Sequence, residues 1–451
     1  MGKLFGTDGV RGVANQYPIT GEVALKTGQA VGIFTRESGY HSVVIGKDTR
    51  LSGDMLEAAL CAGVASTGIN VLQAGIIPTP GVAFLCAHLE TVGAGIVISA
   101  SHNPYEDNGI KIFRRGGEKL SDEQEENIEN FILSTDNKLI LNSVVGTITP
   151  LENSLKKYAD FLLNKDAVKA IKRNSKKKLR LVIDCSNGAA SKIAPMVFNN
   201  ALFETQFIHH IPDGKNINDH CGSQHTEDLA VRVLKEQADI GLAFDGDADR
   251  LIVIDEKGNQ ITGDRILAIC AQHAKQKNRL ENPVVVSTIM SNIGLTQTLD
   301  SLGITHIKAD VGDRKVLEQM KASKASIGGE DSGHMIFLNE HSTGDGMLSA
   351  LMLLKVMSET QESLSSLSSV MNVFPQVLMN VNVDASRPDF MKNKVIADTI
   401  KNIEEKLGSN GRVLIRYSGT QPLLRVMVEG PEQKMVEAYC EQICLSIKEN
   451  L

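Results

Sequence analysis

Short apolar runs recur along the chain, and each leads through a polar or small-residue turn into a helical pattern. Val43-Val44-Ile45 is followed by a turn at 46–50 and by a helix that we expect from about Asp54. Apolar runs at 181–183 and 284–286 repeat this order. Strands that alternate with helices predict α/β layers with largely parallel sheets, and sites at the carboxyl ends of the strands. The pattern therefore predicts three related α/β domains.

The C-terminal part of the chain has a different pattern. Strands are expected at 378–383, 413–415 and 424–428, followed by a helix from about Pro431. Before them, the serine-rich stretch 358–369 continues a helical pattern but is polar enough to lead into a linker. We therefore expect a smaller α+β domain at the end of the chain. The predicted domains are 1–152, 153–255, 256–368 and 369–451.

A compact set of carboxylates is the first candidate site. The segment Asp245-Gly246-Asp247-Ala248-Asp249-Arg250 lies between the apolar runs 240–244 and 251–254. In an extended segment alternate side chains share a face, so the three carboxylates can converge. Oxygen ligands at such short spacing favour Mg²⁺ over zinc. A surface Asp-Gly turn is the alternative, but the flanking strands and Arg250 favour a metal site.

Ser101 offers a hydroxyl in the small-residue turn Ile98-Ser99-Ala100-Ser101-His102-Asn103-Pro104. The turn lacks the glycines of a nucleophile elbow, and the chain has no clear His and Asp partners for a hydrolase triad. The hydroxyl could simply satisfy backbone groups before Asn103-Pro104. A phosphorylated serine beside Mg²⁺ would instead have its charge neutralised and its phosphorus made electrophilic.

Two further loops carry groups that suit a phosphorylated sugar. Glu330, Ser332 and His334 stand on a glycine-containing loop that allows the close approach a polyhydroxyl ligand needs. The segment 416–422, with Arg425 beyond it, groups guanidiniums, hydroxyls and a glycine backbone that suit a phosphate dianion. Each loop, taken alone, is also consistent with an ordinary polar turn.

Two basic side chains are candidates for the chemical step. Arg11 lies between Gly9 and Gly12, where it is positioned to reach a transferring phosphoryl group. Lys111, in the strand-like run 110–113, could carry a proton if the site desolvates it. Taken alone, an exposed strand lysine is the simpler interpretation of Lys111.

Composition narrows the range of partners. With 451 residues, 42% hydrophobic and 22% charged, the chain is too long for one core and is typical of soluble globular proteins. Aromatic residues make up only 4%, there is no Trp, and the net charge is −7, so nucleic-acid binding is not expected. The basic run 172–178 is then expected to be solvated surface. No stretch approaches the roughly 20 apolar residues of a membrane span, and the first residues lack a hydrophobic signal core.

Cysteine and histidine spacing argue against zinc. The seven cysteines are scattered through apolar stretches without Cys-X-X-Cys pairs, which predicts reduced core thiols and a cytoplasmic location. One polar segment is crowded with the histidines His209, His210, His220 and His225. Because their spacing is irregular, we do not expect a metal there.

The motifs at 6–12, 98–104, 245–250, 328–334 and 416–422 resemble, in this order, those of the α-D-phosphohexomutase superfamily. They are spread over nearly the whole chain. The resemblance implies four domains around a central cleft, three of them α/β layers with mixed sheets and the last a smaller α+β unit. It implies a small sugar phosphate as partner and leaves a monomer or a homodimer open.

The resemblance also assigns roles at matching positions. Ser101 is the expected phosphoserine, and with Asp245, Asp247 and Asp249 it is expected to hold one Mg²⁺. The expected catalytic residues are Ser101, His102, Lys111 and Arg11. Contacts with the substrate are expected from Arg250, Glu330, Ser332, His334, Arg416, Ser418, Gly419, Thr420 and Arg425.

Three segments, 6–12, 216–225 and 426–430, are most similar to the bacterial branch of the superfamily that acts on glucosamine phosphates. The implied reaction interconverts glucosamine 6-phosphate and glucosamine 1-phosphate through a phosphoserine and a 1,6-bisphosphate, supplying amino-sugar nucleotide and cell-wall precursor synthesis. Two residues depart from the superfamily pattern: Asp331 stands where Gln is usual, and Gln421 where Glu is usual. The sugar preference is therefore less specified than the reaction.

Other functions remain open at this point. One is a mutase that prefers mannose or glucose phosphates, and another is a magnesium-dependent sugar phosphatase whose phosphoserine is simply hydrolysed. A non-catalytic sugar-phosphate binder is the least favoured. For a mutase, exclusion of water favours closure of the last domain through a hinge near residues 369–375.

Overall fold

The computed structural model describes residues 1–451 except 1–3, 7–8, 135–143, 385–387 and 419–421. The described residues form two compact units. The larger unit contains 1–289 and 305–369, and the smaller contains 290–304 and 370–451. Among the described residues, no helix has the length and apolar character needed to cross a bilayer.

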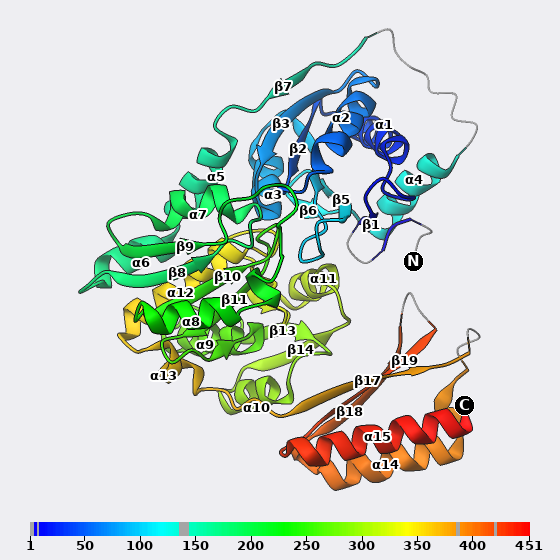
Figure 1. The fold of residues 1–451 in the computed structure, drawn as a ribbon, viewed down its shortest axis with the longest axis vertical. Coiled ribbons are helices and arrows are strands. Elements are labelled where there is room, and N and C mark those ends of the chain that lie inside the picture. The colour runs from blue at the N-terminus through cyan, green and yellow to red at the C-terminus, as the bar shows by residue number, and fades with distance from the viewer. Residues whose placement is uncertain (1–3, 7–8, 135–143, 385–387, 419–421) are drawn as a thin grey trace. The chain divides into compact units, whose positions relative to one another are not determined.

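The N-terminal sheet of the larger unit is mixed (Figure 1). Its strand order is β1-β5-β4-β2-β3-β7, with β6 on β5. Strands β4, β2, β3 and β7 are parallel neighbours, whereas β1 and β5 add antiparallel pairs at one edge. The strands are β1 (Val10–Val13), β2 (Ser42–Lys47), β3 (Asn70–Ile76), β4 (Val92–Ile98), β5 (Asp107–Arg114), β6 (Glu118–Lys119) and β7 (Ile148–Pro150). The helices in this part are α1 (Gly21–Glu37), α2 (Gly53–Ala65), α3 (Thr79–His88), α4 (Asp122–Leu133), α5 (Ser154–Leu163) and α6 (Asp166–Asn174).

The second sheet has the order β12-β11-β10-β8-β9, in which β10, β8 and β9 are parallel and β11 and β12 antiparallel. Its strands are β8 (Leu179–Asp184), β9 (Phe203–Ile208), β10 (Ile240–Phe244), β11 (Leu251–Asp255) and β12 (Gln260–Ile261). Between them lie α7 (Ala190–Phe198), the 3₁₀ turn η1 (Gly222–Gln224) and α8 (Glu227–Lys235).

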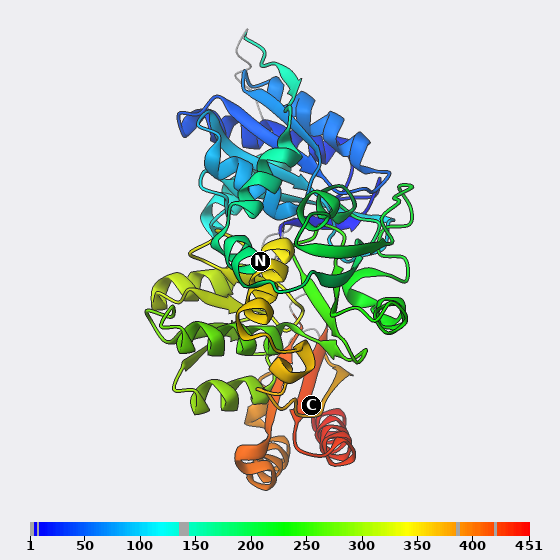
Figure 2. The ribbon, with the colours of Figure 1, turned by 90° about the vertical axis from the view of Figure 1, so that its left-hand side faces the viewer.

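The third sheet, β14-β13-β15-β16, is parallel except for its last pair. Its strands are β13 (Val284–Thr288), β14 (Thr305–Ala309), β15 (Ile327–Gly329) and β16 (Met335–Phe337). The accompanying helices are α9 (Gly263–Gln276), α11 (Asp313–Ser323), α12 (Gly346–Thr360) and α13 (Leu364–Ser368). The apolar α12 packs against α6, α9, β11 and β16, and Figure 2 shows it (yellow) in the middle of the larger unit.

The smaller unit contains an antiparallel three-stranded sheet, β17-β19-β18, with two long helices on it (Figure 1). The amphipathic α14 buries its apolar stripe, Ile396, Ile400, Ile403 and Leu407, in the core of this unit. The elements of the unit are α10 (Ile293–Ser301), β17 (Gln376–Asn382), η2 (Phe390–Lys392), α14 (Lys394–Leu407), η3 (Gly408–Asn410), β18 (Arg412–Tyr417), β19 (Leu423–Glu429) and α15 (Gln433–Asn450).

The fold class predicted from the sequence is confirmed: three α/β parts with mixed sheets precede a smaller α+β part. The strands expected near 43–45, 181–183, 284–286, 378–383, 413–415 and 424–428 all form. The stretch 358–369 is more helical than a linker, because α13 continues after α12 and Ser365 hydrogen-bonds to Glu256. The four predicted domain boundaries stay a prediction.

Candidate active site

The carboxylate segment lies at the carboxyl end of β10, a fully buried strand. Asp245, Asp247 and Asp249 are all buried, and each offers an oxygen within 4.8 Å of the others. The expected extended conformation is wrong: residues 246–248 form a turn in which Ala248 has a φ of +55°. The carboxylates therefore converge because the backbone turns, and not because alternate residues of a strand share a face.

Close backbone contacts hold this carboxylate turn against the Ser101 turn. A Cβ on Gly246 would lie 2.5 Å from the carbonyl oxygen of Ser101, and one on Gly188 would lie 2.3 Å from the carbonyl oxygen of Gly246. Real Cβ atoms do not tolerate such contacts, so glycine is required at both positions. The two turns, more than 140 residues apart in sequence, are thus packed backbone against backbone.

The structure brings the Ser101 hydroxyl to the carboxylates. Ser101 follows β4 in a turn, has a φ of +54° and is only 1% exposed. Its Oγ donates a 2.5 Å hydrogen bond to Asp245 Oδ2 and lies 3.3 Å from His102 Nδ1. The simpler interpretation of the sequence, in which this hydroxyl hydrogen-bonds to backbone groups of its own turn, is therefore wrong: the hydroxyl donates to Asp245 instead.

Two residues that the sequence did not identify as functional hold the Ser101 turn. The buried Arg50 pairs with Asp48 at 2.9 Å and donates to the carbonyl oxygens of Ser101, Asn103 and Pro104. Asn218 Nδ2, from the loop after β9, donates to the carbonyl oxygens of Ser101 (2.8 Å) and Asn103 (2.9 Å). Both residues lie in loops beyond the carboxyl ends of strands. Because sites in α/β folds form at these ends, this position could have marked both residues as functional candidates.

Cations surround the carboxylates. Lys111, on β5, is 2% exposed, and its Nζ lies 2.9 Å from Asp247 Oδ2 and 3.5 Å from Asp249 Oδ2. Arg250 Nε lies about 4 Å from both Asp245 and Asp249, at 4.0 and 3.9 Å. Lys111 is therefore desolvated and is not an exposed strand lysine. Desolvation is the condition under which the sequence analysis expected it to carry a proton.

The pKa values of Asp245 and Asp249 are shifted in opposite directions. Burial, and then the charges of Asp249 and Asp247, raise the pKa of Asp245 well above its usual value. Burial opposes ionisation of Asp249 as well, but Lys111 and His334 lower its pKa well below its usual value. Because like charges repel at this spacing, a cation bound beside Asp245 would favour the ionised form of that carboxyl.

The residues fit a bound Mg²⁺. Asp247 Oδ1 and Asp249 Oδ1 are buried oxygens that have no hydrogen-bond partner within the described part of the chain. Buried carboxylate oxygens normally have a partner, and a hard cation supplies one. Thr79, at the start of α3, orients the same loop, since its Oγ1 donates to Asp247 Oδ2 at 2.5 Å.

His102 and Arg11 are close enough to interact electrostatically. Burial, and then the positive charges of Arg250 and Arg11, lower the pKa of His102 to about 4. His102 is therefore neutral at neutral pH. Arg11 lies on β1, where its backbone pairs with Gly109 of β5. Thr7 and Asp8, part of the same sequence motif, lie outside the described residues.

The proposed sugar loop connects β15 and β16. Glu330 Oε1 accepts the N–H of Gly312 at 3.2 Å, and Glu330 Oε2 accepts from Ser332 Oγ at 3.3 Å. His334 is buried, with Nδ1 3.6 Å from Asp249 and Nε2 3.5 Å from Asp313. Burial lowers the pKa of His334, but the carboxylates of Asp249, Asp313 and Glu330 together outweigh it, and the pKa is raised to about 9. This geometry favours a charge-balancing role for His334, and a direct sugar contact stays a prediction.

Asp331, one of the two departures from the superfamily pattern, stabilises a helix. Its Oδ1 accepts the N–H of Asp264 at 3.3 Å in the first turn of α9, whose own N-cap, Thr262, provides no side-chain cap. Asp331→Gln is expected to lower the free energy of unfolding by about 1 kcal/mol, because a capping carboxylate at a helix N-terminus is lost. Chemical denaturation measures this, and Asp331→Asn, which keeps an oxygen at the same reach, serves as the control. Equal stability of the Gln variant and the native protein would contradict the capping role.

The proposed phosphate-binding residues lie on one hairpin of the smaller unit. Arg416 on β18 and Arg425 on β19 are directly opposite each other in the antiparallel pair, so their side chains leave the sheet from neighbouring positions on the same face. Ser418 is buried, and its N–H donates to the carbonyl oxygen of Leu423 at 2.8 Å. Gly419, Thr420 and the second departure, Gln421, lie outside the described residues.

Four family models match the chain in order. They describe phosphoglucomutase/phosphomannomutase α/β/α domain I at residues 2–139, domain II at 156–258, domain III at 262–374 and the C-terminal domain at 378–446.

Two curated relatives are similar over their whole length. Phosphoglucosamine mutase of Desulforapulum autotrophicum is 59% identical over 460 residues, which cover 100% of this chain and 99% of that protein. Phosphoglucosamine mutase of Syntrophus aciditrophicus is 50% identical over 454 residues, which cover 100% of both chains.

Solved structures show the same fold at low identity. A phosphoglucomutase/phosphomannomutase family protein from Burkholderia thailandensis superposes with a TM-score of 0.80 at 23% identity, covering 98% of this chain and 97% of that chain. Aspergillus fumigatus N-acetylphosphoglucosamine mutase, solved with GlcNAc-6P and magnesium, superposes with a TM-score of 0.70 at 15% identity, covering 99% and 95%.

Proposed function

Because the chain belongs to the phosphoglucomutase/phosphomannomutase family, within the α-D-phosphohexomutase superfamily, we propose that it is a phosphoglucosamine mutase. Its substrates are then glucosamine 6-phosphate and glucosamine 1-phosphate. The observation that carries the proposal is the 2.5 Å hydrogen bond from Ser101 Oγ to Asp245. It joins a hydroxyl able to bear a phosphoryl group to a group of three buried carboxylates.

The reaction starts from phosphorylated Ser101. The 1-hydroxyl of glucosamine 6-phosphate attacks the phosphorus, so the bond from phosphorus to Ser101 Oγ breaks while a bond to the sugar oxygen forms. The sugar hydroxyl loses its proton and Ser101 Oγ regains one. The resulting 1,6-bisphosphate then reorients so that its 6-phosphate faces Ser101. The 6-phosphoryl group is transferred to Ser101, which leaves glucosamine 1-phosphate.

Side chains around Ser101 have separate roles in this transfer. Lys111 is the proposed proton carrier, because it is desolvated and lies at hydrogen-bond distance from the carboxylate turn. Neutral His102, with Nδ1 3.3 Å from Ser101 Oγ, orients the serine oxygen. Arg11 and Arg250, the two cations that lower the pKa of His102, offset the phosphate charge.

Asp245, Asp247 and Asp249, with the phosphate on Ser101, are the proposed holders of Mg²⁺. A phosphoserine adds a charge of about −1.5 to −2 to a site that already contains three carboxyl groups. When bound, Mg²⁺ neutralises phosphate charge and makes the phosphorus more electrophilic. Glu330 and Ser332 are the proposed ligands of sugar hydroxyls, and Arg416, Ser418, Gly419, Thr420 and Arg425 of the phosphate that does not react.

An assay of the purified protein tests the function against its alternatives. Glucosamine 6-phosphate, mannose 6-phosphate and glucose 6-phosphate are compared as substrates with Mg²⁺ and a trace of the matching bisphosphate. The highest kcat/KM is expected for the glucosamine substrate, without release of inorganic phosphate. A higher value for mannose or glucose phosphate would overturn the amino-sugar preference, and stoichiometric phosphate release would instead establish a phosphatase.

Arg425→Ala is expected to raise KM for the sugar phosphate by about 10- to 100-fold while kcat changes little. A charge-assisted hydrogen bond contributes about 1.5–3 kcal/mol, and the phosphate it holds is remote from the transferred group. Steady-state kinetics measure the split between KM and kcat. Arg425→Lys keeps the charge but loses the bidentate fork, so an intermediate KM is expected. A large loss of kcat at unchanged KM would remove Arg425 from the phosphate-binding role.

A further inference from the structure

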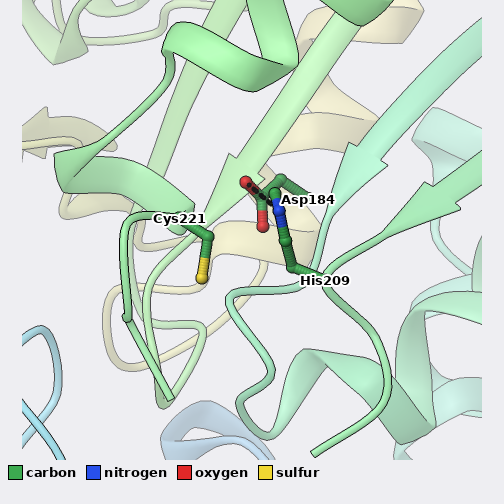
Figure 3. Close-up of side chains that lie close together, drawn as sticks. All are labelled: Asp184, His209 and Cys221. Atoms are coloured by element: carbon green, nitrogen blue, oxygen red, sulfur yellow. Dashed lines mark hydrogen bonds and ion pairs between the residues drawn. The ribbon is translucent and has the colours of Figure 1, made fainter. Parts of the chain in front are cut away.

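Three side chains outside the carboxylate site converge at the carboxyl ends of β8 and β9 (Figure 3). Asp184 ends β8, His209 follows β9, and Cys221 precedes the 3₁₀ turn η1. A carboxylate oxygen, an imidazole nitrogen and the Cys221 sulfur all lie within 4.8 Å of one another. Asp184 and Cys221 are buried, while the His209 side chain is 27% exposed. The cluster is therefore accessible to a solute through His209.

The donor atoms are held in place by their neighbours. Asp184 Oδ2 accepts from His209 Nδ1 at 3.0 Å and from the N–H of Gly222 at 2.9 Å, while its Oδ1 accepts the N–H of Ser186 at 2.8 Å. The other imidazole nitrogen, His209 Nε2, lies 3.5 Å from Asp228. A carboxylate behind the second nitrogen is the usual arrangement for an imidazole that binds a metal, because it fixes the tautomer and the ring orientation.

The electrostatics of the cluster favour an added cation. Burial, and then the Asp184 carboxylate, raise the pKa of the Cys221 thiol. A thiolate beside this carboxylate is thus unfavourable alone, but a divalent ion between them would attract both. Sulfur, nitrogen and oxygen in one set of three match zinc and similar transition metals rather than Mg²⁺.

We propose that Asp184, His209 and Cys221 form a binding site for a zinc-type divalent ion, separate from the Asp245 site. A carboxylate oxygen of Asp184, Nδ1 of His209 and Sγ of Cys221 are the three protein ligands, and water takes the open position. Binding displaces the thiol proton of Cys221 to solvent, and the proton that His209 Nδ1 donates to Asp184 moves to Nε2, facing Asp228, so that the neutral imidazole binds through Nδ1. The site lies beside the active-site turns, because the N–H of Asn218 donates to the Ser186 carbonyl oxygen at 2.9 Å while Asn218 Nδ2 holds Ser101.

The crowding of histidines at 209–225 was therefore a partial signal. Of these histidines His209 joins the cluster, Cys221 comes from the same segment, and Asp184 comes from the end of β8. His220, in contrast, is 88% exposed. Irregular histidine spacing argued against a zinc site built from histidines, whereas the proposed site takes only one of its three ligands from them.

Cobalt(II) absorption tests the site in the full-length protein. A thiolate bound to Co²⁺ gives an intense near-ultraviolet charge-transfer band, which an oxygen-only site such as Asp245, Asp247 and Asp249 cannot give. Co²⁺ is added in the presence of excess Mg²⁺, and Zn²⁺ is then titrated to displace it. We expect one thiolate-bound Co²⁺ per chain, displaced by Zn²⁺.

Matched variants show which residues bind the Co²⁺ that gives this absorption band. His209→Asn removes the imidazole but suits the backbone, since His209 has a φ of +44° and Asn tolerates left-handed conformations. His220→Asn makes the same change at an exposed left-handed histidine, with a φ of +50°, in the same region. Cys221→Ser removes the sulfur, and Cys444→Ser controls for the thiol pair on α15.

His209→Asn is expected to weaken Co²⁺ binding more than about 100-fold, beyond the 10–100-fold effect of losing an outer partner. Cys221→Ser is expected to abolish the band, and His220→Asn and Cys444→Ser to leave it unchanged. Absence of a band in the native protein overturns the proposal, as does a band that survives His209→Asn or disappears in either control variant. Because His209→Asn preserves the local backbone preference, misfolding of the Cys221→Ser protein would not leave the site untested.

Discussion

Ser101→Ala is expected to reduce kcat by at least about 10⁴-fold, the order of loss when an enzyme loses its covalent nucleophile. The proposed reaction passes every transferred phosphoryl group through Ser101 Oγ, and an alanine cannot carry it. The fold is expected to persist, because the hydroxyl donates one hydrogen bond, to Asp245, and the turn is held independently by Arg50 and Asn218. Coupled-assay kinetics and the intact mass of the protein, with one phosphoryl group present in the native form and absent in the variant, provide the measurements.

Ser154→Ala is the matched control for that experiment. Ser154 is also a buried serine, but its Oγ donates to the carbonyl oxygen of Ala74, away from the carboxylates. This variant is expected to lose about 1 kcal/mol of stability and to keep its kcat. If Ser101→Ala turned over substrate at nearly the native rate, the phosphoserine mechanism would be wrong, whatever the stability of either variant.

Asp247→Asn carries the second largest expected effect, a loss of about 10³-fold in kcat with little change in KM for the sugar phosphate. The substitution keeps the shape of the side chain but removes the charge that Lys111 and Mg²⁺ share. About 4 kcal/mol of charge stabilisation in the transition state corresponds to this factor, at 1.36 kcal/mol for each tenfold change. The concentration of Mg²⁺ needed for half-maximal activity is expected to rise at the same time, and kinetics at several Mg²⁺ concentrations measure both effects.

Asp255→Asn separates loss of the metal site from loss of a buried carboxylate. Asp255, at the end of β11, is buried, and its carboxylate accepts the backbone N–H groups of Lys257 and Asn259 in the following turn. This variant is expected to be less stable but to show a native Mg²⁺ requirement. An unchanged Mg²⁺ requirement in Asp247→Asn would remove Asp247 from the proposed metal ligands.

Much of the fold could be predicted because it depends on local patterns. Strands such as β2 and β8 contain the continuous apolar runs 43–45 and 181–183, and parallel sheets buried on both faces produce such runs. Helix α14 was not predicted, although Ile396, Ile400, Ile403 and Leu407 have helical spacing and gave sufficient signal.

The candidate site was predicted less completely, because its geometry depends on long-range contacts. Ser101 and the carboxylates were identified by residue type and position. The Asp245-Gly246 pair signalled a turn, which we set aside for an extended segment, and nothing local indicates the positive φ of Ala248, which alanine rarely adopts. Arg50, Thr79 and Asn218 act through groups distant in sequence: Arg50 donates to carbonyl oxygens more than 50 residues away, and Thr79 to a carboxylate 168 residues away. No local pattern encodes such pairings.

The backbone contacts at Gly188 and Gly246 have a consequence for redesign. Neither position leaves room for even a methyl group, so directed evolution toward a new sugar has no productive substitution there, and libraries that randomise this region would mostly yield inactive clones. Diversity is better introduced at Glu330 and Ser332, the proposed sugar ligands, which are not part of the contact between the serine turn and the carboxylate turn.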